Sequence, residues 1–253
     1  TAGGVWTSSN TATATVNAST GLVTGVAAGS TTITYTVTSI NGCSTSVTTT
    51  VTVNAIPVVA AISGTTEVCA GSTTGLTSAT AGGTWSSSNT ATATVNASTG
   101  VVTGVAAGSV TITYTVTING CTSNAQATVT VNALPVLASI GGTTNACVGS
   151  TTTLTNTTSG GVWTSSATAV ATVNTITGTV TGVSAGTSTI TYTYTNSNGC
   201  VSSVTTTVTI NALPTVAAIT GTTSVCAGAT TTLSDVTAGG VWTSSNTATA
   251  TVN

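Results

Sequence analysis

Hydrophobic and polar residues alternate along many short stretches of the chain, the pattern of strands that bury one face. Residues 109–117 read SVTITYTVT and give the clearest example. Serine or threonine occupies every second position, and the apolar positions between them are Val110, Ile112, Tyr114 and Val116. Threonine and valine are both β-branched and favour strands, so the pattern and the residue types agree.

Seven such segments are predicted within residues 58–132, separated by glycine-containing turns. They cover 58–62 together with 65–69, then 73–79, 83–89, 92–97, 100–106, 109–117 and 122–131. The Asn119–Gly120 pair between the last two segments is a strong signal for a two-residue hairpin turn. About seven short strands in so short a stretch predict an all-β fold, an immunoglobulin-like β-sandwich.

The pattern repeats along the whole chain of 253 residues. Steps of 78 or 79 residues separate the four tryptophans, Trp6, Trp85, Trp163 and Trp242, and the three prolines, Pro57, Pro135 and Pro214. Proline cannot donate to a strand ladder, so we place the domain junctions at the prolines. The expected domains are a C-terminal part at 1–56, complete domains at 57–134 and 135–213, and an N-terminal part at 214–253. Short linkers without glycine predict an elongated, stiff rod cut from a longer array.

The repeats resemble a known family. Residues 84–117, TWSSSNTATATVNASTGVVTGVAAGSVTITYTVT, are similar to bacterial immunoglobulin-like domains of group 2 through their W-S-S-S-N, A-T-V-N, G-V-V-T-G-V, A-A-G and T-I-T-Y motifs. The V-C-A-G and N-G-C motifs around the cysteines resemble arrays in very large secreted surface proteins of Bacteroidota, including gliding-motility adhesins. The resemblance implies tandem β-sandwiches at a cell surface and a role in adhesion or gliding.

The composition argues against several classes of function. The chain contains no Lys, Arg or His, and its only acids are Glu67 and Asp235. Without cations we expect no nucleic-acid binding and no polybasic membrane contact, and no apolar stretch is long enough for a membrane span in this segment. The two acids occupy different places in the repeat, so no domain holds a carboxylate pair, and no base is present to activate a hydroxyl. We therefore expect no enzymatic activity, no cofactor and no metal.

Two cysteines per period predict disulfides formed in an oxidising, extracellular setting: Cys43, Cys69, Cys121, Cys147, Cys200 and Cys226. A zinc site is not expected, because histidine is absent and the two cysteines of a period lie 52 or 53 residues apart. Two pairing schemes are open. The simpler scheme places one bridge inside each complete domain, Cys69–Cys121 and Cys147–Cys200.

Strand parity favours the second scheme slightly. Five predicted strands lie between Cys69 and Cys121, and neighbours in such a sandwich alternate in direction. The two cysteines would then lie at opposite ends of the domain, roughly 25–30 Å apart, whereas a disulfide needs Cα atoms within about 7 Å. The alternative partner of Cys69 is Cys200, across the domain junction, and the other four cysteines would have partners outside this stretch.

The aromatic residues have two interpretations, a role in binding or a place in the core. One tryptophan per domain could form a row of rings on which carbohydrates stack. Immunoglobulin-like folds generally bury a tryptophan, however, so we expect the four tryptophans to belong to the core. Tyr35, Tyr114 and Tyr192 share strand parity with neighbouring isoleucines and are also expected in the core.

Together these features predict a structural protein. We expect a stalk or filament segment of a long extracellular repeat protein, by resemblance a bacterial cell-surface adhesin, whose partners are further copies of the repeat in the same chain. Charged residues on edge strands hinder pairing between molecules, and this chain has few of them. Lateral self-association into fibres is therefore a further hypothesis. Two alternatives remain: a module that binds a glycan or protein through its loops, and a non-catalytic spacer of a large secreted enzyme. The sequence does not identify a surface or glycan ligand.

Overall fold

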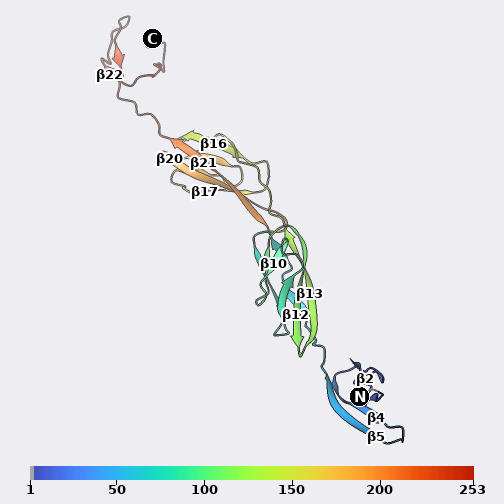
Figure 1. Cartoon of the computed structure of the whole chain (residues 1–253). Coiled ribbons are helices and arrows are strands. Elements are labelled where there is room, and N and C mark those ends of the chain that lie inside the picture. Colours follow the sequence, from blue (N-terminus) through green and yellow to red (C-terminus); the bar gives the residue numbers. More distant parts are fainter. Residues whose placement is uncertain (1–2) are drawn as a thin grey trace. The chain divides into compact units, whose positions relative to one another are not determined.

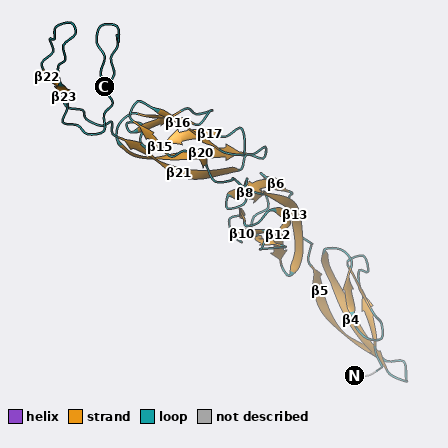
Figure 2. Ribbon diagram, turned by 90° about the horizontal axis from the view of Figure 1, so that it is seen from above, coloured by secondary structure: helices purple, strands orange, loops and turns teal. Residues whose placement is uncertain are grey.

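The computed structural model describes residues 3–253, and its regular elements are strands joined by turns and loops (Figures 1 and 2). The predicted all-β fold is confirmed. In the described part of the chain, no helix has the length and apolarity needed to cross a membrane. The chain divides into two compact units, one holding the residues up to Val136 together with Thr195–Ser202, the other holding Leu137–Tyr194 and Ser203–Asn253.

The first unit contains a complete sandwich between residues 57 and 134. One sheet has the strand order β10-β11-β8-β6 and the other the order β7-β13-β12-β9. All neighbouring strands are antiparallel except β7, which runs parallel to the end of β13. The strands are β6 (Ile62–Gly64), β7 (Glu67–Cys69), β8 (Thr73–Ser78), β9 (Thr84–Ser87), β10 (Ala93–Val95), β11 (Val101–Gly104), β12 (Gly108–Ile118) and β13 (Cys121–Asn132).

The longest hairpin of this unit joins β12 to β13, with a register that runs from Gly108↔Val131 to Ile118↔Cys121. Only Asn119 and Gly120 lie in the turn, with φ angles of 50° and 81°. A two-residue hairpin turn of this kind requires positive φ at both positions, which asparagine and glycine tolerate best. The predicted Asn-Gly turn is therefore confirmed.

The first predicted strand is wrong in part. Residues 58–61 form no strand, and the ladder begins only at Ile62. Side-chain hydroxyls take up the backbone groups of Ala60 instead: its amide donates to Thr80 Oγ1 at 2.9 Å, and its carbonyl accepts from Ser78 Oγ at 3.3 Å. The remainder splits into β6 and β7, which join different sheets, so the sandwich has eight strands where about seven were expected.

The core follows the alternation along the strands. The four apolar residues of β12, Val110, Ile112, Tyr114 and Val116, are between 0% and 6% exposed. They pack with Leu76, Trp85, Val102, Val129 and Val131 from both sheets. Trp85 lies against Tyr114 with 4.6 Å between ring centroids. This is the inward placement expected for both aromatic residues.

The hydroxyl of Tyr114 closes one end of this core. It donates to the carbonyl of Thr80 at 2.7 Å and accepts from the amide of Gly83 at 2.9 Å. A side chain on Gly83 would fall 2.5 Å from the ring of Tyr114, so only glycine fits against it. The tyrosine therefore ties the loop before β9 to the middle of β12.

Replacing Tyr114 by phenylalanine is expected to destabilise this sandwich by about 1–3 kcal/mol, because the partners at Thr80 and Gly83 lose their hydrogen bonds. Hydrogen exchange followed by mass spectrometry should show faster exchange in β9 and β12 peptides. The control is Tyr194→Phe, since Tyr194 is half-buried and its hydroxyl makes no hydrogen bond to residues 3–253. Equal effects of the two substitutions would contradict the role assigned to the Tyr114 hydroxyl.

Residues 135–213 repeat the architecture, with sheet orders β14-β16-β19-β18 and β15-β21-β20-β17. The core of this sandwich again pairs a tryptophan with a tyrosine, Trp163 with Tyr192, at 4.6 Å between ring centroids. Its strands are β14 (Gly141–Gly142), β15 (Asn145–Cys147), β16 (Thr151–Thr155), β17 (Val162–Ser165), β18 (Ala171–Val173), β19 (Thr179–Gly182), β20 (Gly186–Thr195) and β21 (Val201–Asn211).

The two ends of the chain carry partial sandwiches. Residues 3–56 form a three-stranded sheet of order β1-β4-β5 and a two-stranded sheet of β2 and β3. Beyond residue 213 the described strands are the short pair β22 (Thr220–Gly221) and β23 (Leu233–Ser234). The N-terminal strands are β1 (Val5–Ser8), β2 (Ala14–Val16), β3 (Val23–Gly25), β4 (Gly29–Thr38) and β5 (Ser44–Val53).

Candidate functional site

The main chemical feature of the structure is a disulfide between Cys69 and Cys200, with 5.6 Å between the Cα atoms. The two cysteines are 131 residues apart, well beyond one repeat of 78 or 79 residues. Both belong to the first compact unit, which takes in residues 195–202 as well as the sandwich before Val136. This is the pairing that strand parity favours over bridges inside single domains.

Cys69 is positioned by the parallel strand pair. It is the last residue of β7 and lies in register with Asn132, the last residue of β13. The carbonyl of Asn132 accepts a hydrogen bond from the amide of Ala70 at 2.9 Å, which continues the ladder one residue past the cysteine. The side chain of Cys69 is thus held at the end of the sheet where the chain leaves the sandwich after β13.

Cys200 is positioned by an asparagine-capped loop between β20 and β21. The side-chain oxygen of Asn196 accepts from the amides of Asn198 at 3.0 Å and Cys200 at 2.9 Å. The backbone of Asn196 also bonds to Gly199 and Cys200. An asparagine that accepts two amides folds a short loop back on itself. Cys200, at the end of this loop, is fully buried.

Two asparagine side chains add hydrogen bonds beside the disulfide. Asn196 Nδ2 donates to the carbonyl of Ala133, and Asn198 Nδ2 donates to Asn132 Oδ1, both at 3.2 Å. Sequence reasoning interpreted Asn-Gly only as a turn signal and missed these contacts. The available signal was the N-G-C motif itself, which places asparagine two residues before every loop cysteine.

A second site of the same kind lies at Asn54. Asn54 Nδ2 donates to the carbonyl of Asn119 at 3.0 Å, and Cys121 Sγ lies 3.7 Å from the carbonyl oxygen of Asn54. The corresponding distance from Cys200 Sγ to the Asn132 carbonyl is 3.9 Å. Asn54 and Asn132 are one repeat apart, so both loop cysteines dock at the same kind of strand end.

The bridges inside single domains are absent from the described residues because their cysteines lie at opposite ends of one strand. Cys69 is in register with the last residue of β13, whereas Cys121 is the first residue of that strand. A strand of 12 residues spans about 40 Å. Four cysteines remain as thiols: Cys43, Cys147 and Cys226 are exposed and Cys121 is half-buried.

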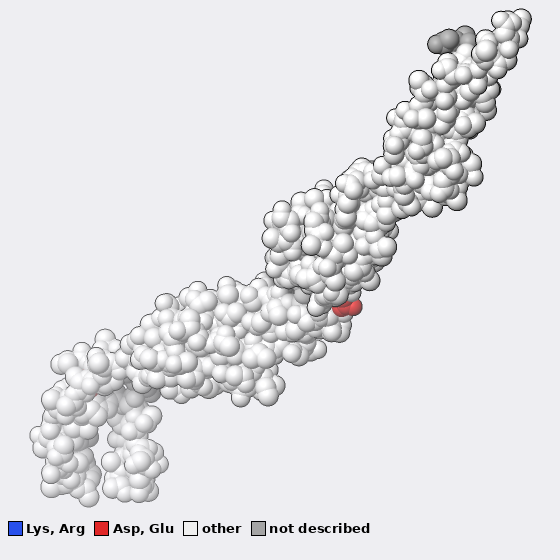
Figure 3. All heavy atoms as spheres, turned by 90° about the horizontal axis from the view of Figure 1, so that it is seen from below, with Lys and Arg blue, Asp and Glu red and all other residues white. Residues whose placement is uncertain are grey.

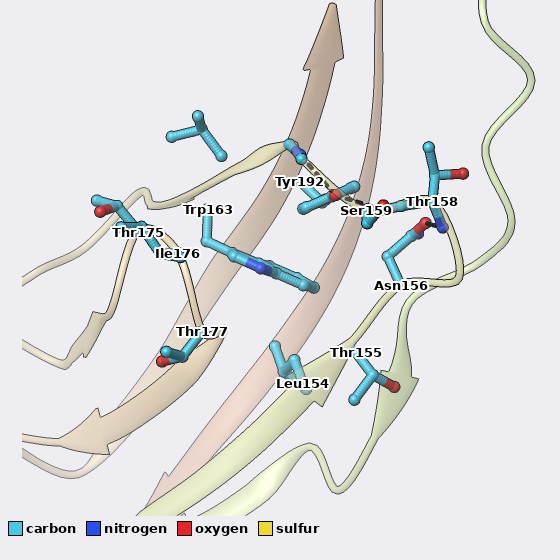
Figure 4. Close-up of a pocket in the computed structure, with 13 residues that line it drawn as sticks. Leu154, Thr155, Asn156, Thr158, Ser159, Trp163, Thr175, Ile176, Thr177 and Tyr192 are labelled. Carbon is cyan, nitrogen blue, oxygen red and sulfur yellow. Dashed lines mark hydrogen bonds between the residues drawn. The ribbon is translucent and has the colours of Figure 1, made fainter.

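The aromatic residues of the complete sandwiches do not form an open binding face. Trp163 is 3% exposed and lies beside a hollow of about 490 Å³ (Figure 4). Its indole ring lies between the turn that carries Thr175–Thr177 and the loop that carries Thr158 and Ser159 (Figure 4). The Tyr192 hydroxyl donates to the carbonyl of Thr158 and accepts from the amide of Gly161. In this sandwich the ring that would stack on a sugar is part of the core.

The aromatic residues at the chain ends are less covered. Trp6 and Tyr35 form the same pair, with 4.6 Å between ring centroids, but both are half-buried. Trp242 is exposed. The prolines that mark the expected junctions, Pro57, Pro135 and Pro214, all lie outside strands, a few residues after β5, β13 and β21 end.

Little chemistry other than thiol chemistry is available in the described residues. No group of three or more Cys, Asp or Glu side chains is close enough together to hold a metal ion there. The surface in Figure 3 is almost entirely uncharged, as expected for a chain with two acids and no Lys or Arg. Every buried side-chain nitrogen or oxygen among these residues has a hydrogen-bond partner.

Residues 2–51 and 45–131, together just over half of the chain, match the family described as bacterial Ig-like domain (group 2). The chain belongs to this family, and the two complete sandwiches are tandem immunoglobulin-like domains. Comparison with curated proteins gives no match.

Some solved structures are similar to the chain at low sequence identity. Domains 1–6 of the surface layer protein SbsC are 22% identical, with 87% of this chain and 37% of that chain covered and a TM-score of 0.29. A SusE-like surface-located polysaccharide-binding protein from the Bacteroides thetaiotaomicron heparin utilisation locus is 13% identical (76% and 48% covered, TM-score 0.39). Mouse cadherin-23 EC22–24 is 12% identical (83% and 86% covered, TM-score 0.28). The chain spans less than half of the first two structures.

Proposed function

We propose that the chain is a stalk segment of a long extracellular repeat protein of the bacterial adhesin type. In this role, immunoglobulin-like domains in series hold another part of the protein at a distance from the cell. The observation that carries the proposal is the Cys69–Cys200 disulfide, whose 131-residue separation links consecutive repeats covalently. A bridge between repeats resists bending and pulling at the junction.

The chemistry of the junction supports an extracellular location. Disulfides persist in oxidising compartments and are rare in the cytosol. The asparagine contacts at Ala133 and Asn132 add neutral hydrogen bonds, and no ion pair with Lys, Arg or His can form anywhere in the chain. Because there are almost no charges to screen, the dimensions of such a stalk should not depend on salt.

Lateral association into fibres is the weaker part of the proposal. The sheet edges of the complete sandwich are β6, β7, β9 and β10, which have only three or four residues each. Short edge strands limit pairing between molecules, and among these four strands β7 also carries a charged residue, Glu67. The main partners we propose are therefore repeats joined end to end.

Loop-mediated binding of a glycan or protein is the competing function. The aromatic ring that sequence reasoning considered for stacking is buried in each complete sandwich. A spacer of a large secreted enzyme would use the same property as a stalk, namely length without charge. The function we propose for this segment is therefore to hold another part of the protein at a distance from the cell.

Small-angle X-ray scattering tests the proposal. The chain should first be alkylated at its free thiols, so that only monomers are measured. We expect a radius of gyration well above the value of about 18 Å for a compact chain of this length, unchanged between low and high salt. Reduction of Cys69–Cys200 should make the particle more flexible. A compact particle, or dimensions that respond strongly to salt, would argue against a stalk.

A further inference from the structure

The backbone is unprotected just after β13 ends. Residues 133–136, here called the linker, form no strand, and Ala133, Leu134 and Val136 are exposed, Val136 to 94%. Pro135 has no amide hydrogen, and the amides of the other three residues donate to no other residue of 3–253. The linker therefore presents free backbone amides and exposed side chains to solvent.

The same feature recurs one repeat earlier, so it belongs to the repeat itself. Residues 55–58 come shortly after β5 and also form no strand. Val58, the equivalent of Val136, is 89% exposed. The backbone amides of residues 55–58 likewise donate to no other residue in the described part of the chain.

Loops within the sandwich are closed by hydrogen bonds instead. The amides of Val105 and Ala106 both donate to the carbonyl of Thr92, at 2.8 and 3.1 Å. The amide of Ser98 donates to the side-chain oxygen of Asn96 at 3.0 Å. A protease binds its substrate as an extended strand through main-chain hydrogen bonds, so a closed loop must open before it can be cut. The linker needs no such opening.

The side chains of the linker fit one class of endopeptidase. Trypsin-type enzymes need Lys or Arg, which this chain lacks, and chymotrypsin-type enzymes prefer large rings, which are buried in the core pair of each complete sandwich. Elastase-type enzymes have a small specificity pocket that takes short aliphatic side chains, and the linker offers Ala133 and Val136. The bond after Leu134 is disfavoured, because Pro135 follows it and has no amide hydrogen.

The Cys69–Cys200 disulfide spans the linker. Cys69 precedes residues 133–136 in the sequence and Cys200 follows them, so the covalent connection across the linker runs through the backbone and through the bridge. Cys200 is fully buried, which shields its sulfur from attack by a reductant. A break in the backbone of the linker therefore leaves the two pieces joined.

We propose that the linker is a cleavage site for extracellular endopeptidases that prefer short aliphatic side chains, and that the Cys69–Cys200 disulfide keeps the cut chain in one piece. The cleavage is hydrolysis: one water molecule is consumed, the carbonyl carbon gains a hydroxyl group and the amide nitrogen gains a proton. The disulfide is unchanged, so no oxidant or reductant takes part. The inference goes beyond the proposed stalk, because it requires only that the chain meet such enzymes outside the cell.

Val136→Arg tests the site and the bridge together, because it creates a single trypsin site in a chain that has no Lys or Arg. After alkylation of the free thiols, trypsin should convert the chain to a species that runs as one band on a non-reducing gel and as two fragments after reduction. The variant that also carries Cys69→Ser and Cys200→Ser should give two fragments without reduction. A Val136→Arg chain that resists trypsin, or one whose fragments separate without a reductant, would overturn the proposal.

Val101→Arg is the matched control, since it makes the same change at a residue that is 41% exposed but lies in β11. β11 pairs with β10 on one side and with β8 on the other, so cleavage there requires local opening. Trypsin should cut this variant at least about tenfold more slowly than Val136→Arg. Hydrogen exchange of the β11 peptide shows whether the variant is folded, and equal cleavage rates in folded protein would contradict the special exposure of the linker.

The unmodified chain tests the class of enzyme. With a limiting amount of an elastase-type endopeptidase, the first cut within residues 57–213 should fall after Ala133 or Val136, as identified by mass spectrometry of the reduced fragments. A first cut elsewhere in this range, or no cut at all, would contradict the proposed class.

Discussion

Replacing Ile112 by alanine is expected to destabilise the sandwich of residues 57–134 by about 2–5 kcal/mol. Ile112 is fully buried at the centre of β12, and its register partners on the two neighbouring strands are the small residues Ser87 and Ala127. Small neighbours cannot fill the space that the side chain leaves, so a cavity remains and the full cost applies. A domain of this size has a marginal core, and such a loss is a large share of its stability.

The control for this prediction is Ile118→Ala on the same strand. Ile118 is 51% exposed and lies beside the turn, so the same chemical change should shift stability by no more than about 0.5 kcal/mol. Unfolding in urea measures the free energy of unfolding of both variants. Hydrogen exchange of β12 and β13 peptides measures where protection is lost. If Ile118→Ala proved as harmful as Ile112→Ala, the inward face assigned to β12 would be wrong.

Replacing Cys69 and Cys200 together by serine is expected to cost about 2–5 kcal/mol of stability, since the bridge closes a loop that spans the 131-residue separation. The loss should appear first in β7, which has three residues and is held at its end by the disulfide. The loop at 196–200 should lose protection together with β7, because Asn196 and Asn198 donate to Ala133 and Asn132 at the end of β13, the strand that pairs with β7. Hydrogen exchange of the two peptides measures both effects.

The matched control is the double variant Cys43→Ser with Cys147→Ser. Both cysteines are exposed thiols in the single chain, so their loss should leave the unfolding midpoint and the exchange of β7 unchanged in dilute, alkylated protein. Unchanged exchange in the Cys69 and Cys200 variant would mean that the hydrogen bonds alone fix the loop. The structural role given to the bridge would then fail.

Much of the fold can be predicted from local patterns in the sequence. The alternation of residues 109–117 predicts β12 and its inward face, and Asn119–Gly120 predicts a two-residue turn that the structure contains. The spacing of the tryptophans predicts a repeat of one small sandwich, and the family match supports the same assignment. These features depend on neighbours in the sequence, so they can be recognised without knowledge of the rest of the fold.

Other features depend on contacts between distant residues. The sequence indicated a strand at 58–62, but the hydroxyls of Ser78 and Thr80 bind the backbone of Ala60 and the ladder starts only at Ile62. The parallel pairing of β7 with β13 was also not predicted, although it is what sets Cys69 beside Asn132. The asparagine contacts at the loop of Cys200 were missed for the same reason.

The sequence by itself determined the class of this protein: an all-β chain of tandem repeats with two cysteines per repeat, two acids and no Lys, Arg or His. Strand parity could only favour the bridge between Cys69 and Cys200 over a bridge within one domain. The tertiary structure decided which cysteines meet, because a disulfide depends on where two strand ends lie in space, and the order of residues along the chain does not fix that alone.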